Sequence, residues 1–590
     1  MATREGVENV LQEGTAAEGA RERPLRRAAR GARSQRRRWL PSRVRHNTFL
    51  RSLAVLAVYT TPASAQAPDT AAAIIRGRVE ALRAGRVVNV SGVRLLAVDA
   101  LPSFYAQREF RPAWTDPSRL AALLQAVRAS AEDGLTPADY LLEPLEHLGP
   151  AATNPRAPAT LRADLDLLAT EALVRLVSSL RYGKVVPATL ESTWNAPLAG
   201  SVDLPPPILE TIMASDTLAG AVAAVAPRNP LYLRLREELA RYRAVDSAGG
   251  WPPVEPGPTL TIGLNDPRVP TLRRRLAESG DLPDFAAAVP GARYDRSLAT
   301  GVAHFQARHG LAVDGVVGPR TIGELNVAVS VRIRVIRVNL ERARWVLPGL
   351  GSTFVAVNIP AYEAYFVRND SLIWSGRAVV GQPYLETPQF RARMTYLVLN
   401  PTWTIPPQIL TDEVLPDIRR DPTYLARHNM LVIDREGEAV DPALVDWEAY
   451  DGRTLPYRIV QAPGGGNPLG RIKFVFPNEY SVYLHDTPEP NLFLRSRRSF
   501  SHGCIRIQHP MTLASELLGD STWTPAALDS VVALGRETTL PLPAPLPVLV
   551  VYWTAWTEQD GALNFRPDLY GRDGAVLQAL DAPFTFFGRP

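Results

Sequence analysis

Phe500-Ser501-His502-Gly503-Cys504-Ile505-Arg506 contains the single cysteine of this 590-residue chain. A lone cysteine is often a small buried hydrophobe. This one follows a histidine and a glycine and lies 19 residues after a second histidine, His485. Because a nearby imidazole can accept the thiol proton and produce the reactive thiolate, the pattern favours a nucleophile over a packing residue.

Two histidines compete for the role of base. The segment Val482-Tyr483-Leu484-His485-Asp486 alternates like a strand, and pairing it with the strand at Cys504 would bring His485 across from the thiol. His502 is two residues from the cysteine, but the glycine turn between them leaves its direction open. We predict that His485 is the general base and that His502 is a positioning residue.

The residues around the thiol also predict groups that stabilise an oxyanion. Gly503 permits a tight backbone, so that the amide of Cys504, helped by the amide of Gly503, can face the oxyanion of a tetrahedral intermediate. Tyr483, on the same strand face as His485, is a further candidate donor. Arg506 either binds a substrate carboxylate in bidentate fashion or forms a salt bridge that holds the loop.

A zinc site is the competing chemistry, since cysteine and histidine both bind zinc. With one cysteine, such a site would need His485, His502, His509 or a carboxylate as further ligands. The chain has neither C-x-x-C nor H-E-x-x-H spacing around these residues. We therefore expect no metal at Cys504.

The N-terminal 65 residues resemble an export signal. Residues 1–51 hold 13 arginines and five acids, a net charge of +8, and an uncharged apolar run (53–59) leads to Ala63-Ser64-Ala65. This is the order of a secretory signal, here with a long basic region. Since the whole chain carries +5, the part beyond Ala65 carries −3, which gives no reason to expect nucleic-acid binding. We expect an exported protein of the periplasm or cell envelope, with no membrane-spanning segment after removal of the leader.

The rest of the chain divides by pattern. Residues 66–95 are Ala-rich and predict a linker, or a short strand and helix, and residues 96–250 show apolar residues at helical spacing. A Pro- and Gly-rich linker follows, and residues 259–327 predict a small three-helix unit. Its expected faces are Val269, Leu272 and Leu276 on one helix and Leu298, Val302 and Phe305 on another. Beyond about residue 350, short β-rich runs predict a mainly β region that contains Cys504.

The motifs of this β region resemble a known family. His485 followed by Ser501-His502-Gly503-Cys504-Ile505-Arg506 is similar to the signature of the L,D-transpeptidases with a YkuD-type catalytic domain. The preceding Pro463-Gly464-x-x-Asn467-x-Leu469-Gly470-x-x-Lys473-Phe474 is similar as well. Asn400-Pro401-Thr402-Trp403-Thr404-Ile405-Pro406 resembles an insertion that caps the active site in the large, multidomain, YcbB-like periplasmic subgroup.

The resemblance extends over most of the chain. Phe305-Gln306-x-Arg308-His309-Gly310-Leu311 and Asp314-Gly315-x-x-Gly318 resemble a peptidoglycan-binding domain, and Gly134-Leu135-x-Pro137-x-x-Tyr140 resembles the helical scaffold of these enzymes. The implied architecture is a mostly α scaffold domain, a small three-helix peptidoglycan-binding-like domain and a mainly β catalytic domain. The expected catalytic domain covers 328–540, with the capping insertion at about 400–447, and a C-terminal strand and tail cover 541–590.

The family implies a peptidoglycan cross-linking reaction. Cys504 would attack the carbonyl of diaminopimelate in a tetrapeptide stem and release D-alanine, and an amine of a neighbouring stem would then take the acyl group, forming a 3→3 cross-link. The resemblance implies no metal or organic cofactor, stem peptides as donor and acceptor, cell-wall synthesis proteins as partners, and acylation of Cys504 by carbapenems. Arg506, Ser501, Trp403 and Asn467 are the expected substrate-binding residues, with simple packing as the alternative for Trp403.

Several alternatives stay open on the sequence alone. Attack of water on the same thioester would make the protein an L,D-carboxypeptidase, and a non-catalytic wall-binding scaffold would lack Cys504 or His485, both of which are present. The residue after the base is Asp486, whose carboxylate could orient His485 or point to solvent.

Overall fold

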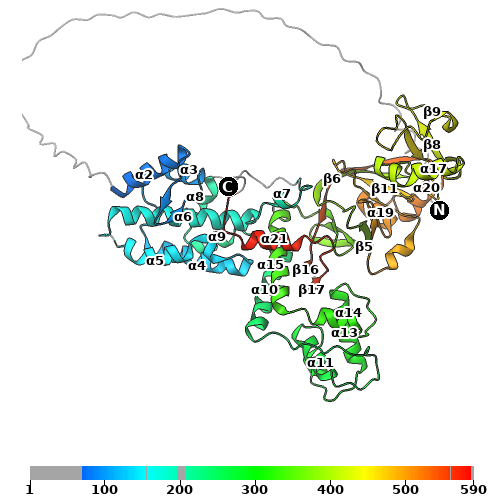
Figure 1. Ribbon diagram of the computed structural model, residues 1–590. Helices are drawn as coiled ribbons and strands as arrows, with labels where there is room; N and C mark the ends of the chain where they lie inside the picture. Colours follow the sequence, from blue (N-terminus) through cyan, green and yellow to red (C-terminus); the bar gives the residue numbers. More distant parts are fainter. Residues whose placement is uncertain (1–69, 155, 196–205, 559, 587–590) are drawn as a thin grey trace, which may run out of the picture. The chain divides into compact units, whose positions relative to one another are not determined.

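The computed structural model describes residues 70–154, 156–195, 206–558 and 560–586 (Figure 1). The predicted signal peptide at 1–65 lies outside these residues. The described part of the chain contains four separate hydrophobic cores. Within it, no helix has both the length and the apolar character needed to cross a bilayer.

The first core belongs to a helical scaffold. Its longest helix, α6 (Ala159–Tyr182), is buried on nearly all sides, as expected of a helix surrounded by others. Further helices add apolar side chains to this core: α2 (Thr70–Arg83), α3 (Ala100–Gln107), α4 (Pro117–Ala129), α5 (Leu142–Ala152), α8 (Pro206–Ala214), α9 (Leu218–Ala223) and α10 (Pro230–Ser247). The predicted helical scaffold is therefore confirmed.

The linker interpretation of residues 66–95 is wrong for residues 70–94. Helix α2 and two short strands, β1 (Asn89–Val90) and β2 (Val93–Arg94), form there. Four apolar side chains of α2, at near-helical spacing, are buried in the scaffold core: Ala71, Ile75, Val79 and Leu82. Alanine favours helix, so this segment forms the helix and short strands that were the alternative.

The small three-helix unit is present. Its helices are α11 (Val269–Glu278), α13 (Arg296–Arg308) and α14 (Pro319–Leu325), with a short α12 (Asp284–Ala287) between the first two. Both predicted apolar faces are buried in its core, which confirms the assignment of these faces from helical spacing.

The third core lies within a β-barrel that carries the cysteine. The strands pair in the order β13-β5-β14-β12-β11-β6-β15-β3-β4, and a further pairing of β5 with β4 closes the sheet. Their bounds are β3 (Phe354–Asn358), β4 (Glu363–Arg368), β5 (Ser371–Gly381), β6 (Phe390–Leu399), β11 (Ile472–Val475), β12 (Leu484–His485), β13 (Ser499–Ser501), β14 (Ile505–Ile507) and β15 (Thr538–Val551). Helices α19 (Pro510–Leu518) and α20 (Pro525–Val532) add apolar side chains to the same core.

The insertion that begins after β6 folds around a core of its own. It contains β7 (Trp403–Thr404), α16 (Pro407–Ile409), a π-helical turn η3 (Leu410–Val414), α17 (Leu415–Arg420), α18 (Tyr424–Arg427), β8 (Met430–Ile433), β9 (Ala439–Val440) and β10 (Arg458–Gln461). Strand β10 pairs with both β7 and β8, and the core includes Leu469. The insertion therefore continues to about residue 469, beyond the expected limit of 447.

Both boundaries of the catalytic domain also differ from the expected residues 328 and 540. Helix α15 (Val329–Val346) buries its apolar residues in the scaffold core rather than in the barrel. Strand β15 pairs with β3 and β6 and continues past residue 540 to Val551. The segment after it forms β16 (Ala555–Thr557), β17 (Leu563–Phe565) and α21 (Asp573–Asp581), and Phe584 and Phe586 then pack into the scaffold core. Apolar periodicity predicts that a helix or strand is buried, but not against which partner.

Candidate active site

Strand register places the predicted catalytic groups on one face of the barrel sheet. His485 of β12 is paired with Lys473 of β11 on one side and with Arg506 of β14 on the other. Side chains two residues apart on a strand share a face, so Tyr483 and Cys504 project on this side as well. The neighbours on the opposite face, such as Leu484 and Ile505, lie in the barrel core.

Cys504 is half-buried, and as the single cysteine of the chain it carries a free thiol. Its Sγ lies 3.7 Å from the carbonyl oxygen of Ser481, which accepts its hydrogen bond. Burial raises the pKa of the thiol, whereas hydrogen bonds from Tyr483 and the positive charges of Arg506 and Lys473 act to lower it. The resting group is therefore a thiol whose anion has several stabilising neighbours.

His485 is buried and oriented by the backbone. Its Nδ1 lies 2.6 Å from the carbonyl oxygen of Asp486. Because a carbonyl oxygen can only accept, Nδ1 carries the hydrogen, which leaves Nε2 as the basic atom of the neutral ring. Burial, followed by the positive charge of Arg506, lowers the pKa of His485 to about 3. The imidazole is thus a neutral proton acceptor at physiological pH.

The side chain of Asp486 binds Arg471 and not His485. Its carboxylate accepts hydrogen bonds from the backbone amide and the Nε of Arg471, at 3.0 and 3.1 Å. The backbone carbonyl, and not the carboxylate, is the group of Asp486 that orients His485. This arrangement does not depend on the charge of the Asp486 side chain.

Hydrogen bonds of a serine stabilise the cysteine loop, which comprises residues 501–504. Ser501 Oγ donates to the carbonyl oxygen of Cys504 at 2.5 Å and accepts from the amide of Gly503 at 3.2 Å. Gly503 has a φ of 107°, in the region that favours glycine. Among the described residues, the amide of Cys504 has no hydrogen-bond partner. Of the two predicted backbone oxyanion donors, the amide of Cys504 is therefore the available one. The Ser501 hydroxyl holds the loop rather than facing a substrate.

His502 points to the insertion. Its Nε2 lies 2.8 Å from Oε1 of Glu413, in the π-helical turn η3. This contact joins the insertion to the cysteine loop. The contact is consistent with the predicted positioning role of His502, because the imidazole binds Glu413 and not the thiol.

Arg506 shows features of both predicted roles. Its Nη1 forms an ion pair with the exposed Glu489 at 3.0 Å. Its Nε is buried and has no hydrogen-bond partner among the described residues. One edge of the guanidinium therefore holds the loop, and a buried donor on the same face as Cys504 is still unpaired.

Two expected substrate-binding residues have structural roles here. Trp403 is buried in the core of the insertion, so the packing alternative describes it. The Asn467 side chain donates to the carbonyl oxygens of Pro401 and Ala462 and accepts from the amide of Leu469. Because all of its polar atoms bind the backbone, Asn467 fastens the base of the insertion instead of offering a group to a ligand.

Lys473 is a further residue of this face, and it is not among the site residues predicted from the sequence. Its side chain is on the same face as His485 and lies over the ring of Tyr483, with Nζ 5.2 Å from the ring centroid. Burial lowers the pKa of Lys473. The alternation along Ile472-Lys473-Phe474 predicts that Lys473 points away from the core. That it faces the thiol follows only from the pairing of β11 with β12.

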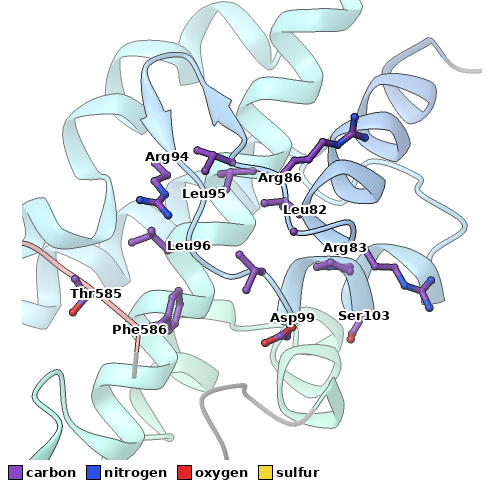
Figure 2. A pocket seen from close by; sticks show the side chains of 14 residues that line it. Leu82, Arg83, Arg86, Arg94, Leu95, Leu96, Asp99, Ser103, Thr585 and Phe586 are labelled. Carbon is purple, nitrogen blue, oxygen red and sulfur yellow. The ribbon is translucent and has the colours of Figure 1, made fainter. Parts of the chain in front are cut away.

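A cavity in the scaffold has no nucleophile and base like those around Cys504. The scaffold has a cavity of about 620 Å³. It is lined by residues from the end of α2, the β2–α3 segment and Phe586 (Figure 2). The guanidinium groups of Arg86 and Arg94 point to different sides of it, and no histidine or cysteine lines it. Among the described residues, no group of three or more His, Cys, Asp and Glu is arranged to hold a metal ion. The candidate site is therefore the face around Cys504.

Three segments of the chain match known protein families. Residues 352–532 match the model of the L,D-transpeptidase catalytic domain, YkuD. This part of the chain is therefore similar to the L,D-transpeptidase catalytic domains. Residues 99–239 match the scaffold domain, and residues 265–325 match a domain described as "Putative peptidoglycan binding domain".

A curated relative supports the same assignment. A protein of Haemophilus influenzae named "Putative L,D-transpeptidase" is 37% identical over 241 residues, which are 41% of this chain and 48% of the relative. The chain thus spans about half the length of the curated relative it matches. Three separate segments of the chain match the scaffold, peptidoglycan-binding and catalytic domain models, so the expected multidomain architecture is confirmed.

Two solved structures were also found to be similar. One is an L,D-transpeptidase from Xylanimonas cellulosilytica, with 16% identity, a TM-score of 0.15 and coverage of 50% of this chain and 100% of the other. The other is a fused Zn-dependent amidase/peptidase/peptidoglycan-binding protein from Clostridium acetobutylicum, with 12% identity, a TM-score of 0.14 and the same coverage. At these TM-scores the two structures carry no argument about the fold.

Proposed function

We propose that this protein is a peptidoglycan L,D-transpeptidase that forms 3→3 cross-links through a thioester on Cys504. The observation that carries the proposal is the shared sheet face of Cys504 and His485, with a free thiol and a neutral imidazole whose Nδ1 is fixed by a backbone carbonyl. A fixed tautomer leaves Nε2 ready to accept a proton. Nucleophile, oriented base and free backbone amide are the parts that acyl transfer needs.

In the first half of the reaction, the thiol turns from the Ser481 carbonyl toward His485 as the substrate enters. Among the described residues no hydrogen bond joins Sγ to the imidazole, and catalytic hydrogen bonds often tighten only when substrate is bound. His485 takes the proton, and Sγ bonds to the carbonyl carbon of diaminopimelate. The carbon–nitrogen bond to D-alanine breaks, and the departing amine receives the proton from His485.

The second half of the reaction regenerates the thiol. The side-chain amine of a neighbouring stem attacks the thioester and gives its extra proton to His485. The carbon–sulfur bond breaks, and the proton returns to Sγ. The unpaired Nε of Arg506 supports binding of a substrate carboxylate on this face, and the insertion joined to His502 supports a covered site from which water is partly excluded.

We also propose the setting in which this reaction occurs. The basic leader and the Ala63-Ser64-Ala65 site support export by a signal peptide, and the peptidoglycan-binding domain supports a location in the periplasm or cell envelope. The domain order supports membership of the large periplasmic subgroup. Stem peptides are the proposed donor and acceptor, with cell-wall synthesis proteins as partners.

The test is incubation of the mature protein with a disaccharide-tetrapeptide, followed by mass spectrometry. A dimer that lacks one D-alanine is the expected product, and a tripeptide alone would show that the enzyme is an L,D-carboxypeptidase. Cys504→Ala should lose at least about 10³-fold in rate, since the nucleophile acts as a unit with its base. Full activity of Cys504→Ala would overturn the assignment of the nucleophile.

A further inference from the structure

The loop between β5 and β6 touches the cysteine loop from behind. Thr387, in this loop, is completely buried. Its Oγ1 donates to the carbonyl oxygen of Gly503 at 2.8 Å and accepts from the amide of Gly381 at 2.9 Å. A threonine hydroxyl has one hydrogen, and here that hydrogen is committed to the residue before the nucleophile.

This hydrogen bond fixes the direction of a second group. The carbonyl of Gly503 and the amide of Cys504 belong to the same peptide unit, which is planar and trans. In a trans peptide the C=O and N–H bonds point in opposite directions. By holding the carbonyl, Thr387 turns the amide of Cys504 away from itself, and that amide is the one without a hydrogen-bond partner among the described residues.

Thr387 is in turn held by the C-terminal segment. The phenolic oxygen of Tyr570 accepts from the amide of Thr387 at 3.2 Å and donates to the carbonyl oxygen of Gly381 at 2.8 Å. The two ends of the loop are thus bridged by one hydroxyl. Close to it, Arg572 forms ion pairs with Glu386 of the same loop and with Glu191 of the scaffold.

The turn that begins at Gly381 has no space for a side chain at this position. A Cβ on Gly381 would lie 2.1 Å from the carbonyl oxygen of Leu385 and 2.6 Å from the amide nitrogen of Thr387, far inside contact distance. The loop therefore closes tightly on itself, and the hydroxyls of Thr387 and Tyr570 satisfy the backbone groups enclosed there. Buried polar groups with complete partners give a rigid support.

We propose that Thr387 and Tyr570 are positioning residues that aim the amide of Cys504 at the oxyanion formed during acyl transfer. The inference rests on the proposed function and adds a support for its oxyanion donor. When Sγ bonds to the carbonyl carbon, the electron pair of the C=O bond moves to oxygen, and the Cys504 amide donates to that oxygen. When the leaving group departs, the pair returns and the hydrogen bond weakens.

The test compares two reactions of the same thiol. A carbapenem acylates the thiol by ring opening through a tetrahedral oxyanion, whereas iodoacetamide alkylates it by displacing iodide and forms no oxyanion. Both rates can be followed by mass spectrometry of the intact protein. Thr387→Val should slow acylation about 10- to 100-fold, which is less than complete loss of an oxyanion donor costs. Alkylation should change less than about twofold, since the support acts on the oxyanion donor only.

Further variants separate positioning from damage to the fold. Thr387→Ser keeps the hydroxyl and should restore acylation. Tyr570→Phe removes one oxygen from the support and should give a smaller loss, and the double variant should be no slower than Thr387→Val, because the two residues act through one hydrogen bond. Tyr365→Phe, which removes a hydroxyl from β4 that binds Glu363, is the matched control and should leave both rates unchanged.

Two results would overturn the inference. One is an equal fall of acylation and alkylation in both Thr387→Val and Tyr570→Phe, which would show a general disturbance of the loop. The other is unchanged acylation in both variants. Failure of the proposed function looks different: the wild-type protein would be acylated by the carbapenem and would depend on Thr387, yet would not cross-link the disaccharide-tetrapeptide.

Discussion

At the scale of single residues, the proposed nucleophile and its proposed base are a neutral pair. Burial raises the pKa of the Cys504 thiol and lowers the pKa of His485 to about 3. Neither group is charged at neutral pH, so in the proposed reaction the thiolate forms by proton transfer and is not stored as an ion pair. This differs from cysteine enzymes in which a charged imidazole stabilises a resting thiolate.

The neutral pair predicts a simple pH profile. The rate of alkylation of Cys504 by iodoacetamide should rise with pH through an apparent pKa above the free-cysteine value of about 8.5. The profile should have no inflection near pH 6.5, because the imidazole is already neutral there. The profile is obtained by measuring the alkylation rate at a series of fixed pH values between 5 and 10. A plateau reached near pH 6 would contradict the neutral pair.

The sequence predicted these two residues but not what holds them. Cys504 and His485 follow from residue types and strand alternation, which are local properties. The carbonyl of Asp486, the hydroxyl of Thr387 and the bonds of Asn467 depend on backbone directions and on partners distant along the chain. A polar residue in a motif can bind a ligand or the backbone, and only the fold distinguishes the two.

At the scale of elements, the pairing of β11 with β12 brings a cation to the thiol. Lys473 is aligned with His485, and its positive charge acts to lower the pKa of Cys504. The β character of this region was predictable from composition and alternation. The register was not, because it is set by the closure of the whole barrel.

Removal of this charge should make the thiol less acidic. Lys473→Met keeps the length and apolar stem of the side chain and removes the ammonium group. We expect the apparent pKa of alkylation to rise and the rate at pH 8 to fall about three- to tenfold, since one pKa unit is a tenfold change in thiolate. Lys473→Arg is the control that keeps the charge, and an unchanged profile in Lys473→Met would refute the electrostatic role.

At the scale of the whole molecule, a buried histidine connects the three-helix unit with the C-terminal segment. His309 stacks on Phe305 with ring centroids 3.9 Å apart and on Phe565 at 5.6 Å. Burial, then the charges of Arg308 and Arg332, lowers the pKa of His309 well below 6.5. Domain order was predictable from the sequence, whereas this contact between distant segments was not, since neither segment carries a pattern that names its partner.

The contact predicts a loss of stability in acid. A group with a lowered folded-state pKa contributes stability above its unfolded value of 6.5, and this contribution is lost as pH falls below 6.5, by about 1.4 kcal/mol per pH unit for each group. His309→Phe removes the protonation site. The fall in the guanidinium denaturation midpoint between pH 7 and pH 5 should therefore be smaller in His309→Phe than in the wild-type protein. His147→Gln, at an exposed position, is the control, and equal pH dependence in both variants would contradict the role of His309.

The last described residues of the chain complete the first core. Phe584 contacts Tyr140 at a ring-centroid distance of 6.2 Å, and the Lys184 ammonium donates to the carbonyl oxygens of Leu580 and Ala582. The carbonyl of Leu580 lies 396 positions after Lys184 in the chain. The scaffold core is therefore complete only when this distant segment has been synthesised and has packed against the helices of the scaffold.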